Sequence, residues 1–253
     1  MIAKESDWYK HSWSLDIKHQ SWVEDTERQV NFIIDHLKLK GNERILDLAC
    51  GFGRHSLSFA SKGFDVVGVD LTKEYIEDAK KTAEEKGLPV TFLLSDLRDV
   101  KFKNEFDVVL NLADGAIGYL ENDTENLKIF DVISNALKPG GKHFMDICNA
   151  EHAEHCFPKS AWEAGKTSIA LSTFEWDSKK RIMLFGGRDI PYGEPACKPE
   201  IIYGDPTRLY SLEEIKTILA ERNMAVQDSF SDYYGRASSY KNLQLMVSSV
   251  KQA

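Results

Sequence analysis

Short hydrophobic runs alternate with amphipathic segments along most of the chain, which indicates strands alternating with helices. Five runs have the length and apolar content of buried strands: 44–49, 65–69, 90–94, 106–111 and 142–148. Four segments repeat apolar residues at helical spacing: 26–38, 54–62, 73–86 and 123–137. Strand and helix repeated in this way bury both faces of a sheet and require right-handed crossovers. The pattern predicts an α/β fold with a doubly wound, mostly parallel sheet.

The alternation of predicted strands and helices ends after residue 150. Residues 167–174 and 180–190 are typical of antiparallel strands joined at WDSKK, and the loop that follows holds four of the seven prolines. We therefore interpret 151–206 as a β-rich insertion on the substrate side of a main domain formed by 30–150 and 207–253.

The main domain resumes with a helix and two strands. Ser211 and Glu214 stand three residues apart at the start of RLYSLEEIKTILAERN, the spacing of a capping box that begins an amphipathic helix. Two further strands are predicted near 224–231 and 242–249.

Residues 1–29 are polar but carry more aromatic surface than a free tail exposes to water. The aromatic residues are Trp8, Tyr9, Trp13 and Trp22. We expect this segment to fold back on the main domain as a helical lid. Its rings either pack against that domain or cover a cationic ligand through cation–π attraction.

Composition narrows the classes of function. The 253 residues suffice for one domain with an insertion, and a net charge of −8 opposes a large phosphate-binding surface, so we expect no nucleic-acid partner. No run approaches the roughly 20 apolar residues of a membrane span, and MIAKESDWYK lacks a signal peptide's apolar core. The four cysteines show no CxxC spacing and are expected to be reduced. We expect a cytoplasmic monomer or homodimer that has no membrane partner.

The stretch ILDLACGFGRHSLSFASKGFDVVGVD contains the most specific chemistry. Gly51 and Gly53 lie between a strand and a helix, where backbone N–H groups and missing Cβ atoms let a ligand approach the main chain. Asp70 ends the next strand, the position from which a carboxylate accepts hydrogen bonds from ribose hydroxyls. The stretch predicts a nucleoside ligand.

Two residues decide which nucleoside is favoured. A dinucleotide turn requires a third glycine at position 56, and this chain has Ser56. Asp47 lies on the strand before the turn, where its carboxylate repels a diphosphate and attracts an ammonium or sulfonium group. Charge therefore favours S-adenosylmethionine over a nicotinamide dinucleotide.

Five segments in order now carry a family resemblance: ILDLACGFGRHS, VVGVDLT, LLSDLRDV, FDVVLNLADGAIGYL and ALKPGGKHFMDI. Across residues 30–150 the chain resembles the class I S-adenosylmethionine-dependent methyltransferases, and its later segments resemble the small-molecule branch with a β insertion. The resemblance implies a seven-stranded Rossmann-like sheet whose final strand is antiparallel. It also implies S-adenosylmethionine as cofactor and S-adenosylhomocysteine as product.

The resemblance also implies roles for individual positions. Asp70 would hold the ribose, with Leu71 against the adenine, and Asp96 would accept from the adenine amino group beside Leu97. Asn111 and Leu112 would present backbone near the methionine ammonium. The positions that would line the methionine part are Asp47, Ala49, Gly51 and Gly53.

Each polar assignment has a structural alternative. Asp47 could bond local backbone, Asp70 could cap the helix that begins at Thr72 or Lys73, and SDLRDV around Asp96 also reads as a plain polar turn. Arg54 either reaches the cofactor carboxylate or forms an ion pair.

Catalysis needs a dry site that aligns sulfonium and acceptor, and a hydroxyl or ammonium acceptor also needs a base. The base candidates are Tyr119 and His152, with Asn149 and His155 nearby. The substrate candidates are Tyr9, Arg208, Tyr210, Tyr234 and Arg236. EHAEHC places His152, His155 and Cys156 at possible metal spacing, but no second pair accompanies them, so no metal is expected.

The segment NLADG, at 111–115, lacks the Pro-Pro-aromatic pattern that resembles enzymes methylating planar amides and nucleobase amines. We therefore expect methyl transfer to a small molecule, on oxygen or nitrogen rather than carbon. Two alternatives stay open. One is an NAD-dependent oxidoreductase, and the other is a non-catalytic module that binds S-adenosylmethionine.

Overall fold

Seven strands form the central sheet of the computed structural model, which describes residues 1–197 and 201–252. These strands are β2 (Arg44–Leu48), β3 (Asp65–Asp70), β4 (Val90–Leu94), β5 (Phe106–Asn111), β6 (Leu137–Cys148), β11 (Met224–Phe230) and β12 (Gln244–Lys251). Their order is β11-β12-β6-β5-β2-β3-β4. Neighbours from β6 to β4 pair in parallel, whereas β12 is antiparallel to both β6 and β11. The predicted α/β fold with an antiparallel final strand is confirmed.

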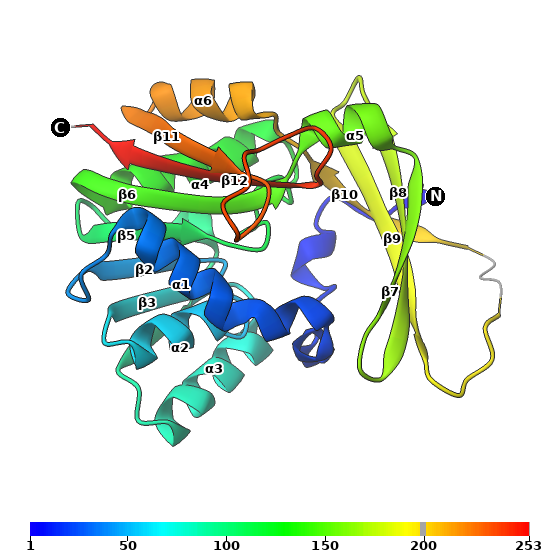
Figure 1. Cartoon of the computed structure of the whole chain (residues 1–253), viewed down its shortest axis with the longest axis horizontal. Helices are drawn as coiled ribbons and strands as arrows, with labels where there is room; N and C mark the ends of the chain where they lie inside the picture. The colour runs from blue at the N-terminus through cyan, green and yellow to red at the C-terminus, as the bar shows by residue number, and fades with distance from the viewer. Residues whose placement is uncertain (198–200, 253) are drawn as a thin grey trace.

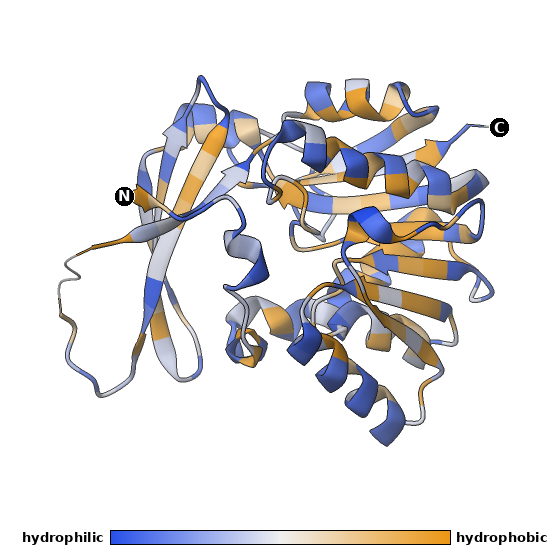
Figure 2. Ribbon diagram, turned by 180° about the vertical axis from the view of Figure 1, so that it is seen from behind, coloured by the Kyte–Doolittle hydropathy of each residue, from blue (hydrophilic) through white to orange (hydrophobic). Residues whose placement is uncertain are grey.

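Helices cover both faces of this sheet, as Figure 1 shows. One face carries α1 (Thr26–Leu37), α2 (Arg54–Ser61) and α3 (Lys73–Glu85), and the other carries α4 (Asp123–Ala136) and α6 (Leu212–Ala220). Figure 2 shows hydrophobic residues along the strands and hydrophilic residues on the outer sides of the helices. The predicted capping box of Ser211 and Glu214 begins α6. None of the helices within the described ranges has the length and apolar character to cross a membrane.

A second sheet of five strands is formed mainly by residues after 150, where the alternation of strands and helices was predicted to end. Its strands are β1 (Ile2–Ala3), β7 (Lys159–Ala164), β8 (Ser168–Asp177), β9 (Ile182–Pro191) and β10 (Tyr203–Arg208), in the order β1-β10-β9-β8-β7. The helix α5 (Ala150–Cys156) connects the two sheets. The antiparallel pair β8 and β9 was predicted; β8 extends into WDSKK as far as Asp177, and β9 begins after it, at Ile182. β1, β7 and β10 were not predicted, and β10 continues past residue 206, where the insertion was expected to end.

The N-terminal segment forms three short 3-10 helices rather than a long lid helix. They are η1 (Trp8–Lys10), η2 (Leu15–His19) and η3 (Ser21–Asp25). In Figure 1 this segment, in blue, lies between the two sheets. Trp8 and Tyr9 are buried in the main core, so packing is their main role, whereas Trp22 is 37% exposed.

Candidate functional site

The turn after β2 contains two glycines with different structural needs. Gly51 has φ +56° and Gly53 has φ +77°, so both adopt left-handed backbone. A Cβ atom at position 53 would lie 2.8 Å from Phe92 Cζ, whereas one at position 51 would meet only Tyr75 Cδ2, at 3.9 Å. The sequence predicted ligand approach at both glycines. Gly53 is required for packing against β4, and of the two glycines only Gly51 has room where a Cβ would stand.

Asp47 lies below this turn and is held by the following helix. Its side chain is buried, and Ser56 Oγ donates to Asp47 Oδ2 at 2.6 Å. Burial raises the pKa of Asp47 to about 6, opposed by the Ser56 hydrogen bond and the charge of Arg54. Ser56, which stands where a dinucleotide-binding turn has its third glycine, therefore orients the carboxylate of Asp47. Ala49, beside it, has φ +56°, so the chain already bends sharply before the glycines.

Asp70 joins the turn to the next helix. Its Oδ2 accepts from Gly51 N at 2.9 Å, and its Oδ1 accepts from Thr72 N at 2.8 Å. The second contact is a turn just ahead of α3, whose N-cap is Thr72, so Asp70 is not itself the helix cap considered as the alternative. A carboxylate has about four acceptor positions, so these two contacts do not fill it.

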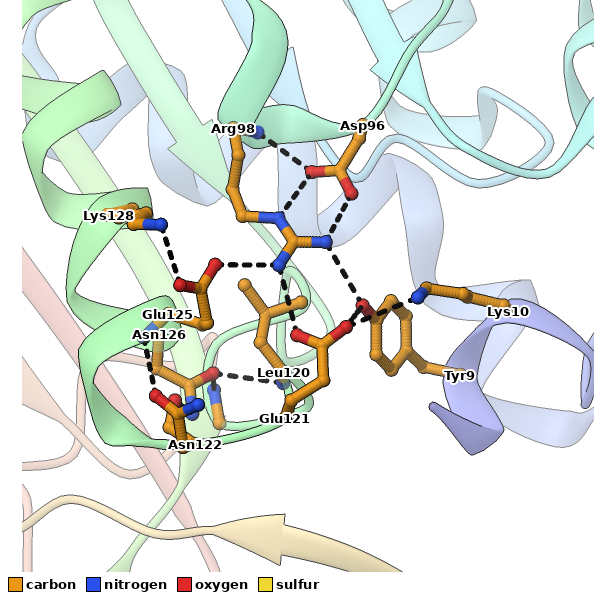
Figure 3. A network of polar contacts seen from close by, with 11 residues as sticks. Tyr9, Lys10, Asp96, Arg98, Leu120, Glu121, Asn122, Glu125, Asn126 and Lys128 are labelled. Atoms are coloured by element: carbon orange, nitrogen blue, oxygen red, sulfur yellow. Dashed lines mark hydrogen bonds and ion pairs between the residues drawn. The ribbon is translucent and has the colours of Figure 1, made fainter. Parts of the chain in front are cut away.

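Asp96, which was expected to accept from an adenine amino group, already accepts hydrogen bonds within the chain. It begins η4 (Leu97–Asp99), and both of its carboxylate oxygens accept from Arg98, Oδ2 at 2.6 Å from Nη2. Arg98 also donates to Glu121 at 3.0 Å and to Glu125 at 2.8 Å (Figure 3). The hydrogen bonds from Arg98 to Asp96, together with the positive charge of Arg98, lower the pKa of Asp96. Its first partner is thus an arginine of this chain, and the neighbouring Leu97 is a core residue.

Asn111, Leu112 and Leu71 border the same edge of the sheet. Asn111 is fully buried, and its Nδ2 donates to Gly115 O at 3.1 Å. Its Oδ1 has no partner among the described residues. Leu112 belongs to the core, and Leu71 packs against the core from a partly exposed position. The unpartnered Asn111 oxygen suits a donor such as the cofactor ammonium.

Arg54 bonds neutral side chains, and the ion pair considered as its structural alternative is not found among the described residues. Its Nη1 donates to Thr26 Oγ1 at 2.8 Å and to Gln29 Oε1 at 2.6 Å. The guanidinium lies 4.9 Å from the centre of the Trp22 ring. These contacts tie the start of α2 to α1 and to the N-terminal segment.

Tyr119 was a candidate base, and the structure makes it a hydrogen-bond donor. Its hydroxyl donates to Asp114 Oδ2 at 3.0 Å. Burial and the charge of Asp114 raise the pKa of Tyr119 well above its ordinary value. The ring centres of Trp8 and Trp13 lie 5.0 and 6.0 Å from that of Tyr119. A phenol in this setting keeps its proton at neutral pH.

Sequence reasoning missed two carboxylates and Tyr233 at this edge. Asp146 is 5% exposed, and its Oδ2 accepts from Tyr233 at 2.9 Å. Burial, with the charge of Asp114, raises the pKa of Asp146 to about 7. Asp114 Oδ1 accepts from Cys148 N at 3.0 Å. The available signal was an aspartate at the end of each of two neighbouring predicted strands, in NLADG and FMDIC.

His152 and its neighbours hold local structure. His152 Nδ1 lies 2.9 Å from Tyr240 O, and burial lowers the pKa of His152. His155 Nδ1 lies 2.8 Å from Glu151 O. Within the described parts of the chain, no group of three His, Cys, Asp or Glu residues is placed to hold a metal.

Two of the five substrate candidates are core residues, which corrects the expectation. Tyr9 and Tyr210 are each 1% exposed. Their hydroxyls donate to Glu121 at 2.8 Å and to Asp123 at 2.6 Å. Neither ring offers a surface to an acceptor.

The other three substrate candidates lie in two separate places. Arg208 pairs with Glu214 at 2.7 Å and lines a cavity of about 380 Å³ beside α4. Tyr234 is 66% exposed and Arg236 pairs with Asp232 at 2.9 Å, both in the loop between β11 and β12. The structure does not bring the five candidates together.

Comparisons with known proteins find similarity to methyltransferases. The family described as "Methyltransferase domain" matches residues 45–141. The YqeM protein of Bacillus subtilis strain 168, named as a methyltransferase, is 34% identical over 120 residues, which cover 47% of this chain and 48% of that protein. The ubiquinone biosynthesis O-methyltransferase of Vibrio parahaemolyticus is 25% identical over 62% of this chain and 65% of its own length. The match to these relatives thus spans about half to two thirds of their length.

Among solved structures, an S-adenosylmethionine-dependent methyltransferase of Clostridium acetobutylicum superposes with a TM-score of 0.73. The alignment covers 97% of this chain and 99% of that one, at 18% identity, and so shows a shared fold. The residues matched by the family model include the glycine turn, Asp47 and Asp70. Residues 45–141 therefore match the methyltransferase domain family, and the chain as a whole shares the fold of S-adenosylmethionine-dependent methyltransferases.

Proposed function

We propose that this chain transfers the methyl group of S-adenosylmethionine to oxygen or nitrogen of a small molecule. The observation that carries the proposal is the pair of buried carboxylates, Asp47 and Asp70, on either side of the open main chain at Gly51. Two negative groups at a close-approach turn favour a positively charged nucleoside and oppose a diphosphate. This charge preference is also why the oxidoreductase alternative is disfavoured.

The chain's own residues would bind and align the cofactor, which supplies an electrophilic methyl on a sulfonium. Asp70 would accept from the ribose hydroxyls with the lone pairs that Gly51 and Thr72 leave free. Asp47, held by Ser56, would face the positive methionine end, with Asn111 Oδ1 as an acceptor for its ammonium. The N-terminal segment would exclude water, which favours transfer by proximity.

The proposal extends to the acceptor and the compartment. A net charge of −8 favours a small molecule over nucleic acid as the acceptor. The four cysteines are free, which suits the reducing cytoplasm. We propose that the five-stranded sheet and the N-terminal segment border the acceptor, since both lie beside the carboxyl ends of the parallel strands (Figure 1).

Calorimetric titration tests this proposal without a known acceptor. The protein should bind S-adenosylmethionine and show no heat with NADH. Asp70→Ala should weaken binding by about 100-fold, because two charged hydrogen bonds are lost, each worth about 1.5 kcal/mol. Asp65→Ala, at the other end of β3 and paired with Arg44, is the matched control and should bind normally. Binding of NADH in place of S-adenosylmethionine would contradict the proposal.

Release of S-adenosylhomocysteine separates an enzyme from a non-catalytic module. A screen of small-molecule acceptors should detect turnover with at least one hydroxyl or amine. Tight cofactor binding with no turnover across such a screen would favour the binding-module alternative.

A further inference from the structure

Two aspartates at the carboxyl ends of β5 and β6 have no role in the cofactor site proposed above. Asp114 N donates to Asp146 O at 2.7 Å, so the two residues touch through their backbone. Tyr119 donates to the carboxylate of Asp114, and Tyr233 donates to that of Asp146. The result is a coupled pair of carboxylates, each with one phenol.

Both oxygens of Asp114 already accept hydrogen bonds, from Tyr119 and from Cys148 N, whereas Asp146 is short of a donor. Asp146 Oδ1 is fully covered and accepts no hydrogen bond from any residue the structure describes. Arg54 contributes the favourable charge felt by Asp146, but its Nη1 donates to Thr26 and Gln29 on α1. A buried carboxylate oxygen without a donor is costly. The pair therefore has capacity for a cationic donor.

The chemistry of the unused positions selects the type of group. The phenol protons of Tyr119 and Tyr233 are already donated, so what remains around the pair is acceptor capacity. An ammonium has only donors, whereas a hydroxyl brings one donor and two lone pairs that would face other acceptors. Trp8 and Trp13 pack beside Tyr119, and aromatic faces of this kind attract cations.

We propose, building on the methyl transfer above, that the acceptor is an amine whose ammonium binds the Asp114–Asp146 pair, and that the pair takes up the proton the amine must lose. One N–H bond breaks, and its proton passes to a carboxylate oxygen of the pair and then to water. The freed lone pair attacks the methyl carbon. The N–C bond forms as the C–S bond breaks, and the electrons of that bond stay on sulfur. The positive charge thus moves from sulfur to nitrogen.

Two segments cover this pair, and one must move to admit an acceptor. The first is the N-terminal segment, whose Trp8 and Trp13 lie against Tyr119. The second is the loop 231–243, which contributes Tyr233. Figure 1 shows both segments between the two sheets, the loop in red and orange. Neither is a strand of the central sheet, so either can open without breaking it.

Matched amine and alcohol acceptors test the proposal. The panel pairs glucosamine with glucose and benzylamine with benzyl alcohol, along with further pairs that differ only in this group. Release of S-adenosylhomocysteine is measured for each, and binding of S-adenosylmethionine is measured by calorimetry. We expect turnover of amines in preference to their alcohols. Asp146→Asn should lower amine turnover by about 100-fold or more, the usual effect of losing a proton acceptor, and leave cofactor affinity within twofold.

Asp114→Asn provides a second variant in case Asp146→Asn does not fold, and Asp131→Asn, on α4 and paired with Arg222, is the control. Turnover of alcohols with inert amines, or no amine turnover at all, would overturn the amine assignment while leaving the cofactor site intact. Undiminished amine turnover in the Asp114→Asn and Asp146→Asn variants would overturn the role of the pair. Failure of the wild-type protein to bind S-adenosylmethionine would instead contradict the proposed function.

Discussion

Ser56 Oγ donates a hydrogen bond of 2.6 Å to Asp47 Oδ2, across the turn that joins β2 to α2. This contact orients the carboxylate and helps keep it charged, since it opposes the rise in pKa that burial causes. Ser56 is the residue that departs from a dinucleotide-binding turn. Serine in place of glycine at position 56 therefore disfavours a dinucleotide and favours a cationic nucleoside.

Removing the Ser56 hydroxyl should weaken binding of S-adenosylmethionine. In Ser56→Ala the pKa of Asp47 rises further, so less of the carboxylate is charged at pH 7, and affinity should fall about twofold if the pKa rises by one unit. Calorimetry measures the change. Ser61→Ala, on the exposed side of the same helix, removes a hydroxyl that bonds only Ser58 O and should leave affinity unchanged. Equal affinities in the two variants would show that the Ser56 contact does not tune the site.

Cofactor affinity should depend on pH through Asp47. Its folded pKa of about 6 means that the carboxylate is mostly protonated at pH 5 and charged above pH 7. A cationic ligand prefers the charged form, so affinity should rise about tenfold from pH 5 to pH 7 and then level off. Titrations at several pH values measure this. Asp47→Asn should bind weakly and lose the dependence. A wild-type profile that is flat from pH 5 to pH 7 would contradict the assigned role.

The two glycines of the turn should separate stability from binding. Gly53→Ala places a Cβ 2.8 Å from Phe92 Cζ and should lower the free energy of unfolding by about 2 kcal/mol or more. Gly51→Ala has room for its Cβ and pays mainly for its left-handed φ, about 1 kcal/mol. Its methyl group, however, points where a ligand approaches. In denaturant unfolding Gly53→Ala should be the less stable variant, whereas in calorimetry Gly51→Ala should bind S-adenosylmethionine more weakly. If one variant is the worse in both assays, the distinction between the two glycines is refuted.

Asp96 should matter more for stability than for the cofactor. Arg98 links it to Glu121 and Glu125, and Glu121 accepts from Tyr9 of the N-terminal segment (Figure 3). Asp96→Ala should lower the free energy of unfolding by about 1–2 kcal/mol, as expected for a lost charged hydrogen bond, and change cofactor affinity less than threefold.

Lys128→Ala is the control for Asp96→Ala. It removes an exposed contact with Glu125 at 2.6 Å and should cost no more than about 0.5 kcal/mol. If Asp96→Ala loses affinity tenfold or more at unchanged stability, the carboxylate instead serves the adenine, as the family resemblance implied.

The sequence predicts the central sheet well because its strands are short apolar runs with clear ends. The predicted bounds of β4 and β5 match the structure, and Asp70 lies at the strand end where the pattern placed it. The second sheet was harder to predict. All six residues of β7 are exposed, so this strand has no hydrophobic alternation, and β1 exists only through pairing with β10.

The acceptor side depends on contacts between distant segments, which composition does not reveal. Asp146 and Tyr233 are separated by 87 positions, and Tyr9 meets Glu121 across 112. Tyr9 was therefore predicted to be a substrate residue, although it is buried. Tyr234 was chosen in the later loop, whereas the residue that bonds Asp146 is its neighbour Tyr233. Local patterns can indicate a ligand turn formed by one stretch of chain, whereas contacts between distant segments, such as those at the proposed acceptor site, require the fold.

A crystal structure of the protein with S-adenosylhomocysteine tests the central claim most directly, namely that two carboxylates beside Gly51 select a cationic nucleoside. We predict ribose hydroxyls within about 3 Å of Asp70, with the amino-acid end of the ligand on the Asp47 side of the turn. A structure in which residues 51–53 instead surround the diphosphate of a dinucleotide, with Asp47 turned away, would contradict the account.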